Sequence, residues 1–147
     1  MEDGSKMKRL LFIFTALLMI TATGCNKEEK KVDYKASLVG QWHCTPEGMD
    51  AEIYVEFVQD GSFALYQQVG EGRYRKFTGL WQCEENILSG TYADGSPWGS
   101  TYQMDFNDGI LTLTALNGSN EVMTYIKKDI PGEVLEDCIE VKSSGSL

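Results

Sequence analysis

The sequence predicts an all-β domain in which eight antiparallel strands follow one another along the chain and close into an up-and-down barrel. From residue 38 to residue 130, apolar and polar side chains alternate with a period of two rather than 3.6. Turn signals interrupt this alternation, and Asp60-Gly61 and Asp108-Gly109 are dipeptides typical of tight hairpins. No segment of this range has a helical periodicity of useful length.

The expected strands cover residues 41–45, 52–59, 62–69, 73–84, 87–92, 100–107, 110–116 and 121–128. A closed barrel leaves no strand edge exposed, and with eight strands it is just wide enough to be filled by side chains or to hold one small ligand. A two-sheet sandwich is the alternative architecture. Strictly sequential hairpins favour the barrel.

The connections between these strands differ in length at the two ends of the barrel. Three of them are tight turns, whereas the four others are longer and cover residues 46–51, 70–72, 93–99 and 117–120. Because alternate connections of a meander lie at alternate ends, one end is expected to be closed and the other to be open and surrounded by loops. Binding residues tend to lie on such loops. The chain enters the first strand and leaves the last strand at the closed end.

The N-terminal segment has the pattern of a secretory signal peptide over residues 1–24. Met7-Lys8-Arg9 is basic, and an apolar stretch follows from Leu10 to Ala22. This stretch is shorter than the roughly 20 residues that a membrane-spanning helix needs. Residues 25–37 begin with a charged run without apolar pattern, so they are expected to form a flexible tether.

Two short motifs at the cleavage site resemble those of bacterial lipoproteins. Ala22-Thr23-Gly24-Cys25 resembles the lipobox, which implies that Cys25 receives diacylglycerol and further acylation and anchors the chain stably to a membrane. Lys27-Glu28-Glu29 resembles the surface-export signal of Bacteroidota lipoproteins. These resemblances imply an outer-membrane lipoprotein, at the periplasmic face or on the cell surface.

Gly40-Gln41-Trp42, at the start of the first expected strand, looks like the Gly-x-Trp signature of lipocalins. The resemblance covers residues 38–130 and is closest to the small lipocalin-like domains of Bacteroidota lipoproteins. It implies that Trp42 fills the closed end of the barrel. Gly79-Leu80-Trp81 repeats the motif on the fourth strand, and the alternation of loops places Trp81 at the same end, in the same role. Residues 131–147 are expected to form a C-terminal tail.

Once Cys25 is lipidated, three cysteines remain: Cys44, Cys83 and Cys138. An oxidising compartment favours one disulfide and one free thiol among them. Lipocalins often attach the C-terminal tail to the fourth strand, and this resemblance implies a Cys83–Cys138 disulfide. A Cys44–Cys83 disulfide is the alternative.

Charge and composition argue against several classes of function. The net charge is −9, and removal of residues 1–24 takes away a net +1 and leaves −10, which disfavours nucleic acid as a partner. A single histidine and the lack of paired-cysteine spacing predict no metal site. No nucleophile–base pair or phosphate-binding glycine loop is recognisable, so we expect neither a cofactor nor an enzyme.

The leading hypothesis from the sequence is a lipid-anchored barrel that binds a small, partly apolar molecule at its open end. Tyr74, Trp98, Tyr102 and Met104 are expected to line the upper cavity. Trp98 either stacks on a ligand or folds back over the barrel.

The alternative hypothesis is a barrel that is filled by its own side chains and acts as a protein-interaction or accessory subunit of an envelope or surface complex. Large aromatic residues at inward positions favour this alternative, namely Phe57, Phe63, Tyr102 and Phe106.

Overall fold

The structure of the protein is a computed structural model that describes residues 31–142. The chain divides into a unit over residues 1–32 and a unit over residues 33–147, and the barrel belongs to the second. The predicted signal peptide and lipidation site, Cys25, lie outside the described residues. No helix within residues 31–142 is long and apolar enough to cross a membrane.

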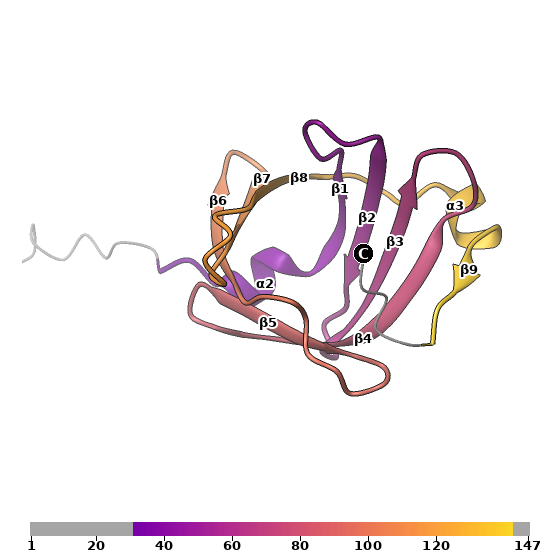
Figure 1. Ribbon diagram of the computed structural model, residues 1–147. Coiled ribbons are helices and arrows are strands. Elements are labelled where there is room, and N and C mark those ends of the chain that lie inside the picture. Colours follow the sequence, from indigo (N-terminus) through magenta and orange to yellow (C-terminus); the bar gives the residue numbers. More distant parts are fainter. Residues whose placement is uncertain (1–30, 143–147) are drawn as a thin grey trace, which may run out of the picture. The chain divides into compact units, whose positions relative to one another are not determined.

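Eight antiparallel strands close into a barrel, which confirms the predicted fold class (Figure 1). The strands are β1 (Gly40–Cys44), β2 (Ala51–Phe57), β3 (Ser62–Val69), β4 (Arg75–Glu84), β5 (Ile87–Tyr92), β6 (Tyr102–Asn107), β7 (Ile110–Ala115) and β8 (Val122–Lys127). Each strand pairs with the next one along the chain, and β8 pairs with β1 to complete the ring. The sheet therefore has the order of a meander and no crossover among these eight strands.

The tight turns form where the sequence predicted them, because their residues adopt left-handed backbone conformations. Asp108 and Gly109 have φ values of 50° and 78°, and Gly61 has a φ of 91°. Glu85 also lies in this region, with a φ of 53°. These three turns lie at one end of the barrel, which is the closed end, and the longer loops lie at the open end.

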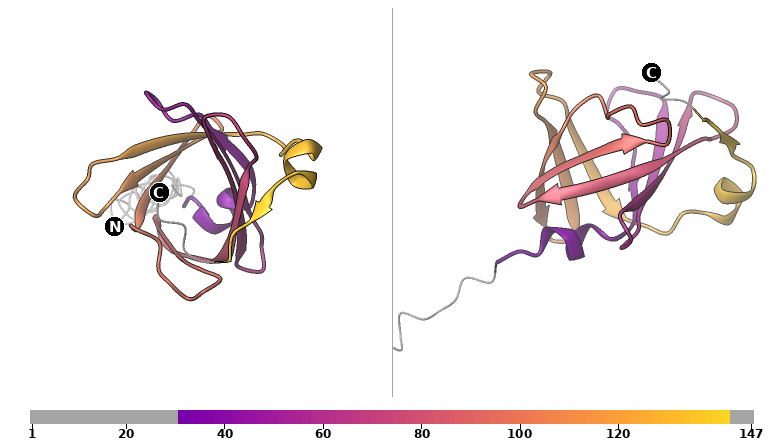
Figure 2. Two further views of the ribbon diagram at one scale, coloured as in Figure 1. Left: turned by 45° about the vertical axis from the view of Figure 1, so that its right-hand side comes forward. Right: turned by 90° about the horizontal axis from the view of Figure 1, so that it is seen from below.

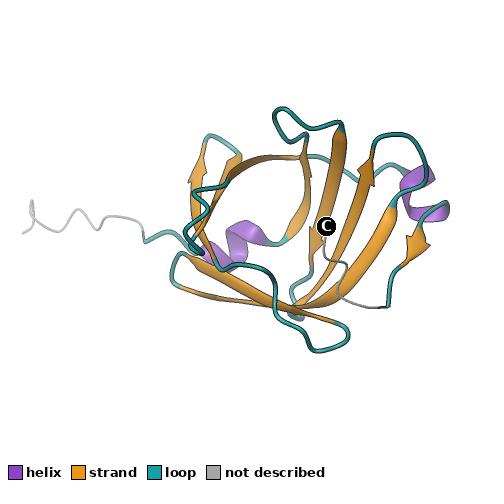
Figure 3. Ribbon diagram, viewed as in Figure 1, coloured by secondary structure: helices purple, strands orange, loops and turns teal. Residues whose placement is uncertain are grey.

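Three short elements were not expected from the sequence: helices α2 (Tyr34–Leu38) and α3 (Gly132–Glu136), and strand β9 (Ile139–Glu140) (Figure 3). Each helix has five residues, too few to show a period of 3.6 residues in the sequence. The side chain of Asp33 accepts a hydrogen bond of 3.1 Å from the backbone N–H of Ala36 and so caps α2. The predicted tether is therefore ordered at its C-terminal end.

The barrel interior is filled by the side chains that the alternation placed inward. Trp42 is 1% exposed, and Leu88 and Leu111 are completely buried. Leu38 of α2 is also completely buried, so this helix covers the closed end from below, as Figure 2 shows in the right-hand view. Apolar burial of this extent is the main force that holds such a barrel together.

The C-terminal segment crosses the outer surface of the barrel from the closed end to the open end (Figure 2). The backbone N–H of Ile130 donates to the side-chain oxygen of Gln41 at 2.8 Å, and Ile130 and Val134 pack against the outward-facing Tyr54 and Tyr66. β9 then runs parallel to β4, with Ile139 opposite Arg75 at the start of that strand.

This path rules out the predicted Cys83–Cys138 disulfide, and Cys44, Cys83 and Cys138 are all free thiols. Cys138 precedes Ile139, which lies beside Arg75, whereas Cys83 is eight residues further along β4. At a rise of 3.3 Å per residue, this separation is about 26 Å, far beyond the reach of a disulfide. The prediction was wrong because the tail does not stay at the closed end.

Candidate functional site

At the closed end, Trp42 is held by two interactions. Its indole Nε1–H donates to the carbonyl oxygen of Leu38 at 2.8 Å. The Lys127 ammonium lies 4.4 Å from the centre of the Trp42 ring, and it also donates to the carbonyl of Val39 at 2.8 Å. Lys127 of β8 thus lies over Trp42 of β1, and both side chains donate hydrogen bonds to backbone carbonyls at the end of α2.

Trp81 lies beside the tight turn between β2 and β3. Its indole Nε1–H donates to the carbonyl oxygen of Val58 at 3.1 Å, and its ring packs edge-on against Phe57 with the centroids 5.7 Å apart. Both tryptophans that the sequence assigned to the closed end are therefore buried there with their N–H groups bonded to backbone.

At the open end, Trp98 comes from the loop between β5 and β6 and turns its ring into the barrel. The ring lies directly over Gly90, where even a Cβ atom would collide with the indole. It packs edge-on against Phe63, with the centroids 5.1 Å apart, and lies 6.4 Å from Tyr102. Of the two alternatives left open by the sequence, folding back over the barrel describes this position.

The backbone of this loop explains why Trp98 points inward. The N–H of Trp98 donates to the carbonyl of Gly90 at 3.0 Å, and the N–H of Tyr92 donates to the carbonyl of Ser96 at 2.8 Å. Residues 96–98 thus pair with β5 where β6 does not reach, because β5 and β6 share only two residue pairs. The loop therefore closes the part of the barrel wall that β6 does not cover, and this pairing places the Trp98 ring over Gly90.

Five aromatic side chains contact one another in a chain that leads from β3 and β4 to the loop of Trp98 and to β6, and we call them the mouth cluster: Phe63, Phe77, Tyr92, Trp98 and Tyr102. Tyr92 contacts both Phe63 and Phe77 at centroid distances of 6.2 Å. Met104 is two residues after Tyr102 on β6 and therefore lies on the same face of the strand. It is 1% exposed and belongs to the same core. Three of the four predicted ligand-binding residues are therefore brought together, and Tyr92 is a member that sequence reasoning missed.

The polar atoms of the mouth cluster differ from those of the closed end. The indole N–H of Trp98 and the hydroxyls of Tyr92 and Tyr102 have no hydrogen-bond partner among residues 31–142, and all three side chains are half-buried. Burial raises the pKa of both tyrosines above the ordinary value, and for Tyr102 the negative charge of Glu121 raises the pKa further. Both hydroxyls therefore remain neutral donors at physiological pH.

Tyr74 does not belong to the mouth cluster, and its assignment to the cavity was wrong. Its ring lies 6.1 Å from that of Tyr54 on the outer face, in the cluster covered by the C-terminal segment. The reason is the alternation itself, because Tyr74 precedes the inward Phe77 by three residues and so lies on the opposite face.

The surroundings of the mouth are apolar with scattered charge. Met49 and Val69 are each 59% exposed and Leu116 is 48% exposed, all on or beside the open-end loops. Arg75 begins β4 and is exposed on the wall opposite β7, and Glu121 is exposed at the start of β8.

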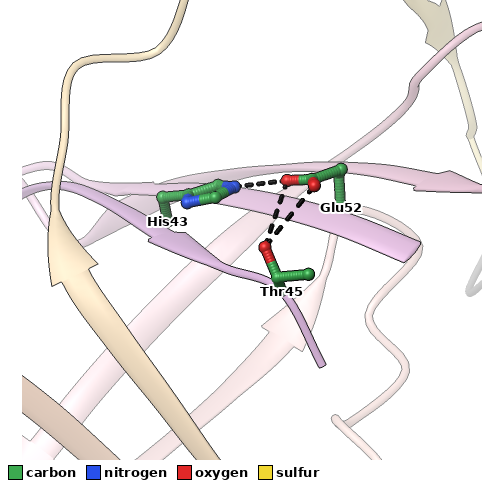
Figure 4. Close-up of polar contacts among 3 residues, drawn as sticks. All are labelled: His43, Thr45 and Glu52. Carbon is green, nitrogen blue, oxygen red and sulfur yellow. Dashed lines mark hydrogen bonds and ion pairs between the residues drawn. The ribbon is translucent and has the colours of Figure 1, made fainter. Parts of the chain in front are cut away.

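His43 takes part in a polar contact on the outer face of β1 and β2 (Figure 4). Its Nε2 contacts a carboxylate oxygen of Glu52, and the Thr45 hydroxyl donates to both oxygens of the same carboxylate at 3.4 Å. The His43 ring also packs on Tyr54 at 4.5 Å. The histidine side chain is only 13% exposed, so the contact links the two strands.

In the part of the chain that the structure describes, no three His, Cys, Asp or Glu side chains are grouped closely enough to hold a metal ion. The His43–Glu52 pair therefore has no third ligand among these residues. A cross-strand pair of this kind stabilises strand pairing.

A shallow groove of about 570 Å³ lies on the outer face of β3, β4 and β5. Its lining consists mostly of small residues but includes Phe63 and Tyr92 of the mouth cluster, and Leu80 in the lining is 62% exposed. Sequence reasoning missed this groove, and the only signal was a set of small outward residues: Ser62, Ala64, Thr78, Thr91 and Ala93. No charged side chain lines it, so it offers little for the orientation of a polar ligand.

No protein-family model and no curated protein matches this sequence. Among solved structures, a protein from Bacteroides uniformis superposes with a TM-score of 0.51 over 65% of this chain and 93% of its own, at 14% identity. Lipoprotein YedD from Klebsiella pneumoniae gives a TM-score of 0.47 at 13% identity, over 69% of this chain and 80% of its own. An uncharacterized protein from Bacteroides eggerthii gives 0.43 at 18% identity, over 62% and 99%. The chain thus shares its barrel fold with the Bacteroides uniformis protein.

Proposed function

We propose that this protein is a non-enzymatic, lipid-anchored lipoprotein of the outer membrane whose barrel binds a small, partly apolar molecule at its open end. The observation that carries the proposal is the mouth cluster, in which the indole N–H of Trp98 and the hydroxyls of Tyr92 and Tyr102 have no hydrogen-bond partner within the described residues, and none of these atoms is fully buried. Aromatic walls with a few convergent polar groups are what a small-molecule site requires.

The lipid anchor is supported by the sequence around Cys25. Because α2 forms the C-terminal end of the predicted tether and lies at the closed end, we expect an acyl anchor on Cys25 to leave the open end facing away from the membrane. Capture of a molecule from the periplasm or from outside the cell suits this orientation. The acidic chain does not suit direct binding to anionic lipid or to nucleic acid.

The proposed set of binding residues differs from the set expected from the sequence. Trp98 and Tyr102 stay in it, Tyr92 joins them, and Met104 forms part of the apolar floor beneath them. Tyr74 leaves the set because it lies outside the barrel. The rings below these residues are packed against one another, so we expect a ligand to lie on top of them rather than deep inside the barrel.

Native mass spectrometry of the lipidated protein, purified gently from its host envelope, tests the proposal. We expect a co-purifying small molecule that is lost from Trp98→Ala and retained by Leu80→Ala. The Leu80 variant is the matched control, because this side chain lies at the outer groove. Loss of the molecule from the Leu80 variant alone would place binding at the groove and contradict the proposal.

A second candidate function is an interaction or accessory subunit of an envelope complex, in which the barrel holds no ligand. The filled lower interior favours it, because Trp42, Phe57, Trp81 and Phe106 pack with centroid distances of 5.7–6.0 Å. A protein that carries no small molecule and takes none up from an envelope extract would support this candidate. Crosslinking in intact cells would then identify the partner.

A further inference from the structure

We infer that the molecule bound at the open end is an organic cation, an amine or quaternary ammonium whose body contacts Tyr92, Trp98 and Tyr102 and whose charge faces Glu121. This inference rests on the proposed function and adds the chemical class of the ligand. It combines the aromatic composition of the mouth cluster with the position of one carboxylate.

The aromatic rings elsewhere in the domain indicate what such a site accepts. The Lys127 ammonium lies 4.4 Å from the centre of the Trp42 ring, and the Lys76 ammonium lies 5.7 Å from the centre of the Tyr66 ring. A cation is attracted to the face of an aromatic ring by the quadrupole of that ring. Within residues 31–142, no lysine or arginine is placed over Tyr92, Trp98 or Tyr102 in this way. A ligand can therefore supply the cation there.

Glu121 supplies the complementary charge. The carbonyl oxygen of Glu121 accepts a hydrogen bond of 2.8 Å from the backbone N–H of Ala115, and Ala115 lies opposite Tyr102 in the pairing of β6 with β7. This register places the residue beside the top of the mouth cluster. Its negative charge reaches Tyr102 and the buried Tyr125, since it raises the pKa of both phenols.

The Glu121 carboxylate takes part in neither ion pair of the described residues, so it is available to a ligand. Between Lys31 and Lys142, the structure contains ion pairs of His43 with Glu52 and of Arg73 with Asp137, and neither involves Glu121. Arg75 is exposed at the start of β4, which β5 and β6 separate from β7. A ligand cation on the Glu121 side is therefore kept away from this arginine, and the negative net charge of the chain favours its approach.

A pair of probes with the same shape and different charge tests the inference: choline and its neutral isostere 3,3-dimethylbutan-1-ol. Saturation-transfer NMR on the lipidated protein in a neutral detergent measures the affinity of each probe. We expect choline to bind about tenfold more tightly than the alcohol, which is the scale of a cation–π contact in a partly desolvated site.

Three variants identify the origin of the difference. Glu121→Gln should remove most of the preference for choline, and Glu71→Gln, on another open-end loop, is the matched control that should keep it. Trp98→Ala should weaken the binding of both probes. A preference for choline that survives Glu121→Gln unchanged overturns the role of this carboxylate.

The failure of this inference can be distinguished from failure of the proposed function. Equal binding of the two probes, weakened in both cases by Trp98→Ala, overturns the cation preference and leaves an aromatic binding site. Absence of binding by both probes, together with an empty protein in native mass spectrometry, overturns both. Far-UV circular dichroism of each variant confirms that the barrel is folded in every comparison.

Discussion

The two ends of this barrel use the same residue type in different ways. At the closed end, Trp42 and Trp81 donate their indole N–H groups to backbone carbonyls, and Trp42 also contacts a lysine. At the open end, Trp98 is packed between aromatic rings, but its N–H has no partner in the described range. Ring packing is common to both ends, so the hydrogen bond distinguishes a structural tryptophan from one that is available to a ligand.

The backbone at each end accounts for this difference. The carbonyl of Leu38 lies at the end of a one-turn helix and accepts the indole N–H of Trp42. The carbonyl of Val58 lies at a tight turn and accepts the indole N–H of Trp81 in addition to the backbone N–H of Gly61. In the loop that carries Trp98, the carbonyl of Ser96 already accepts the N–H of Tyr92, and this pairing fixes the loop along β5. The indole N–H groups of Trp42 and Trp81 are therefore bonded to a helix end and to a turn. The loop of Trp98 uses its backbone to pair with β5 instead, and the indole N–H of Trp98 has no partner in the described range.

The largest expected effect is the loss of the closed-end tryptophan. Trp42→Ala removes a ring that is 1% exposed and should lower the free energy of unfolding by about 4 kcal/mol. Trp98→Ala removes a half-buried ring and should cost about 2 kcal/mol. Urea denaturation of the two variants measures both values. Equal losses would show that the two ends do not differ in this respect.

A side chain added at Gly90, beneath the Trp98 ring, should have an intermediate effect on the free energy of unfolding. Gly90→Ala places a methyl group against the indole, so we expect a loss of about 2 kcal/mol and an outward movement of Trp98. Iodide quenching of tryptophan fluorescence detects that movement. The matched control is Gly99→Ala in the same loop, where a Cβ meets no atom within 4 Å. If both variants behave alike, the close packing over Gly90 does not hold Trp98 in place.

Removal of the closed-end cation should have a smaller effect. Lys127→Met deletes the charge over Trp42 and the hydrogen bond to Val39, and about 1 kcal/mol of stability should be lost. Desolvation lowers the pKa of Lys127, which shows that burial offsets part of the gain from its charge. Lys76→Met, at a ring 5.7 Å away, is expected to cost less, and thermal unfolding compares the two.

The smallest effect at neutral pH concerns Tyr125, which becomes important only in alkali. Burial raises the pKa of this phenol, so the folded chain keeps its proton when the unfolded chain, with a pKa near 10, loses it. Stability is therefore unaffected below pH 10 and falls as the pH rises above that value. Tyr125→Phe should reduce the slope of this fall in urea titrations at pH 10–12. An unchanged slope would mean that other groups cause the alkaline loss.

The sequence predicted the eight strands closely because alternation and turn residues are local signals. β3 and β5 begin and end at the predicted residues, whereas β2 begins one residue earlier and ends two residues earlier than predicted. Short elements were missed for the same reason, since five-residue helices such as α2 carry no periodic signal and depend on the barrel end that they cover.

The candidate site was predicted only in part. Trp98, Tyr102 and Met104 were found because they follow the alternation or stand out in a loop, whereas Tyr74 was misplaced although the alternation from Phe77 puts it outside. The role of Tyr92 depends on contacts with Phe63 and Phe77 across three strands, which no local pattern encodes. The prediction of a Cys83–Cys138 disulfide was wrong because it depended on the path of the C-terminal segment, which no local pattern encodes.

The seam between β1 and β8 has a consequence for how the domain folds. Trp42 pairs with Lys127 and His43 with Ile126, so two residue pairs join segments more than eighty residues apart along the chain. Contacts between such distant segments form late, because the entropy of closing the intervening chain must first be offset. During synthesis from N-terminus to C-terminus, one edge of β1 therefore stays unpaired until β8 has been made. The rate of barrel closure, rather than the formation of any hairpin, sets how long that edge is open to misassembly.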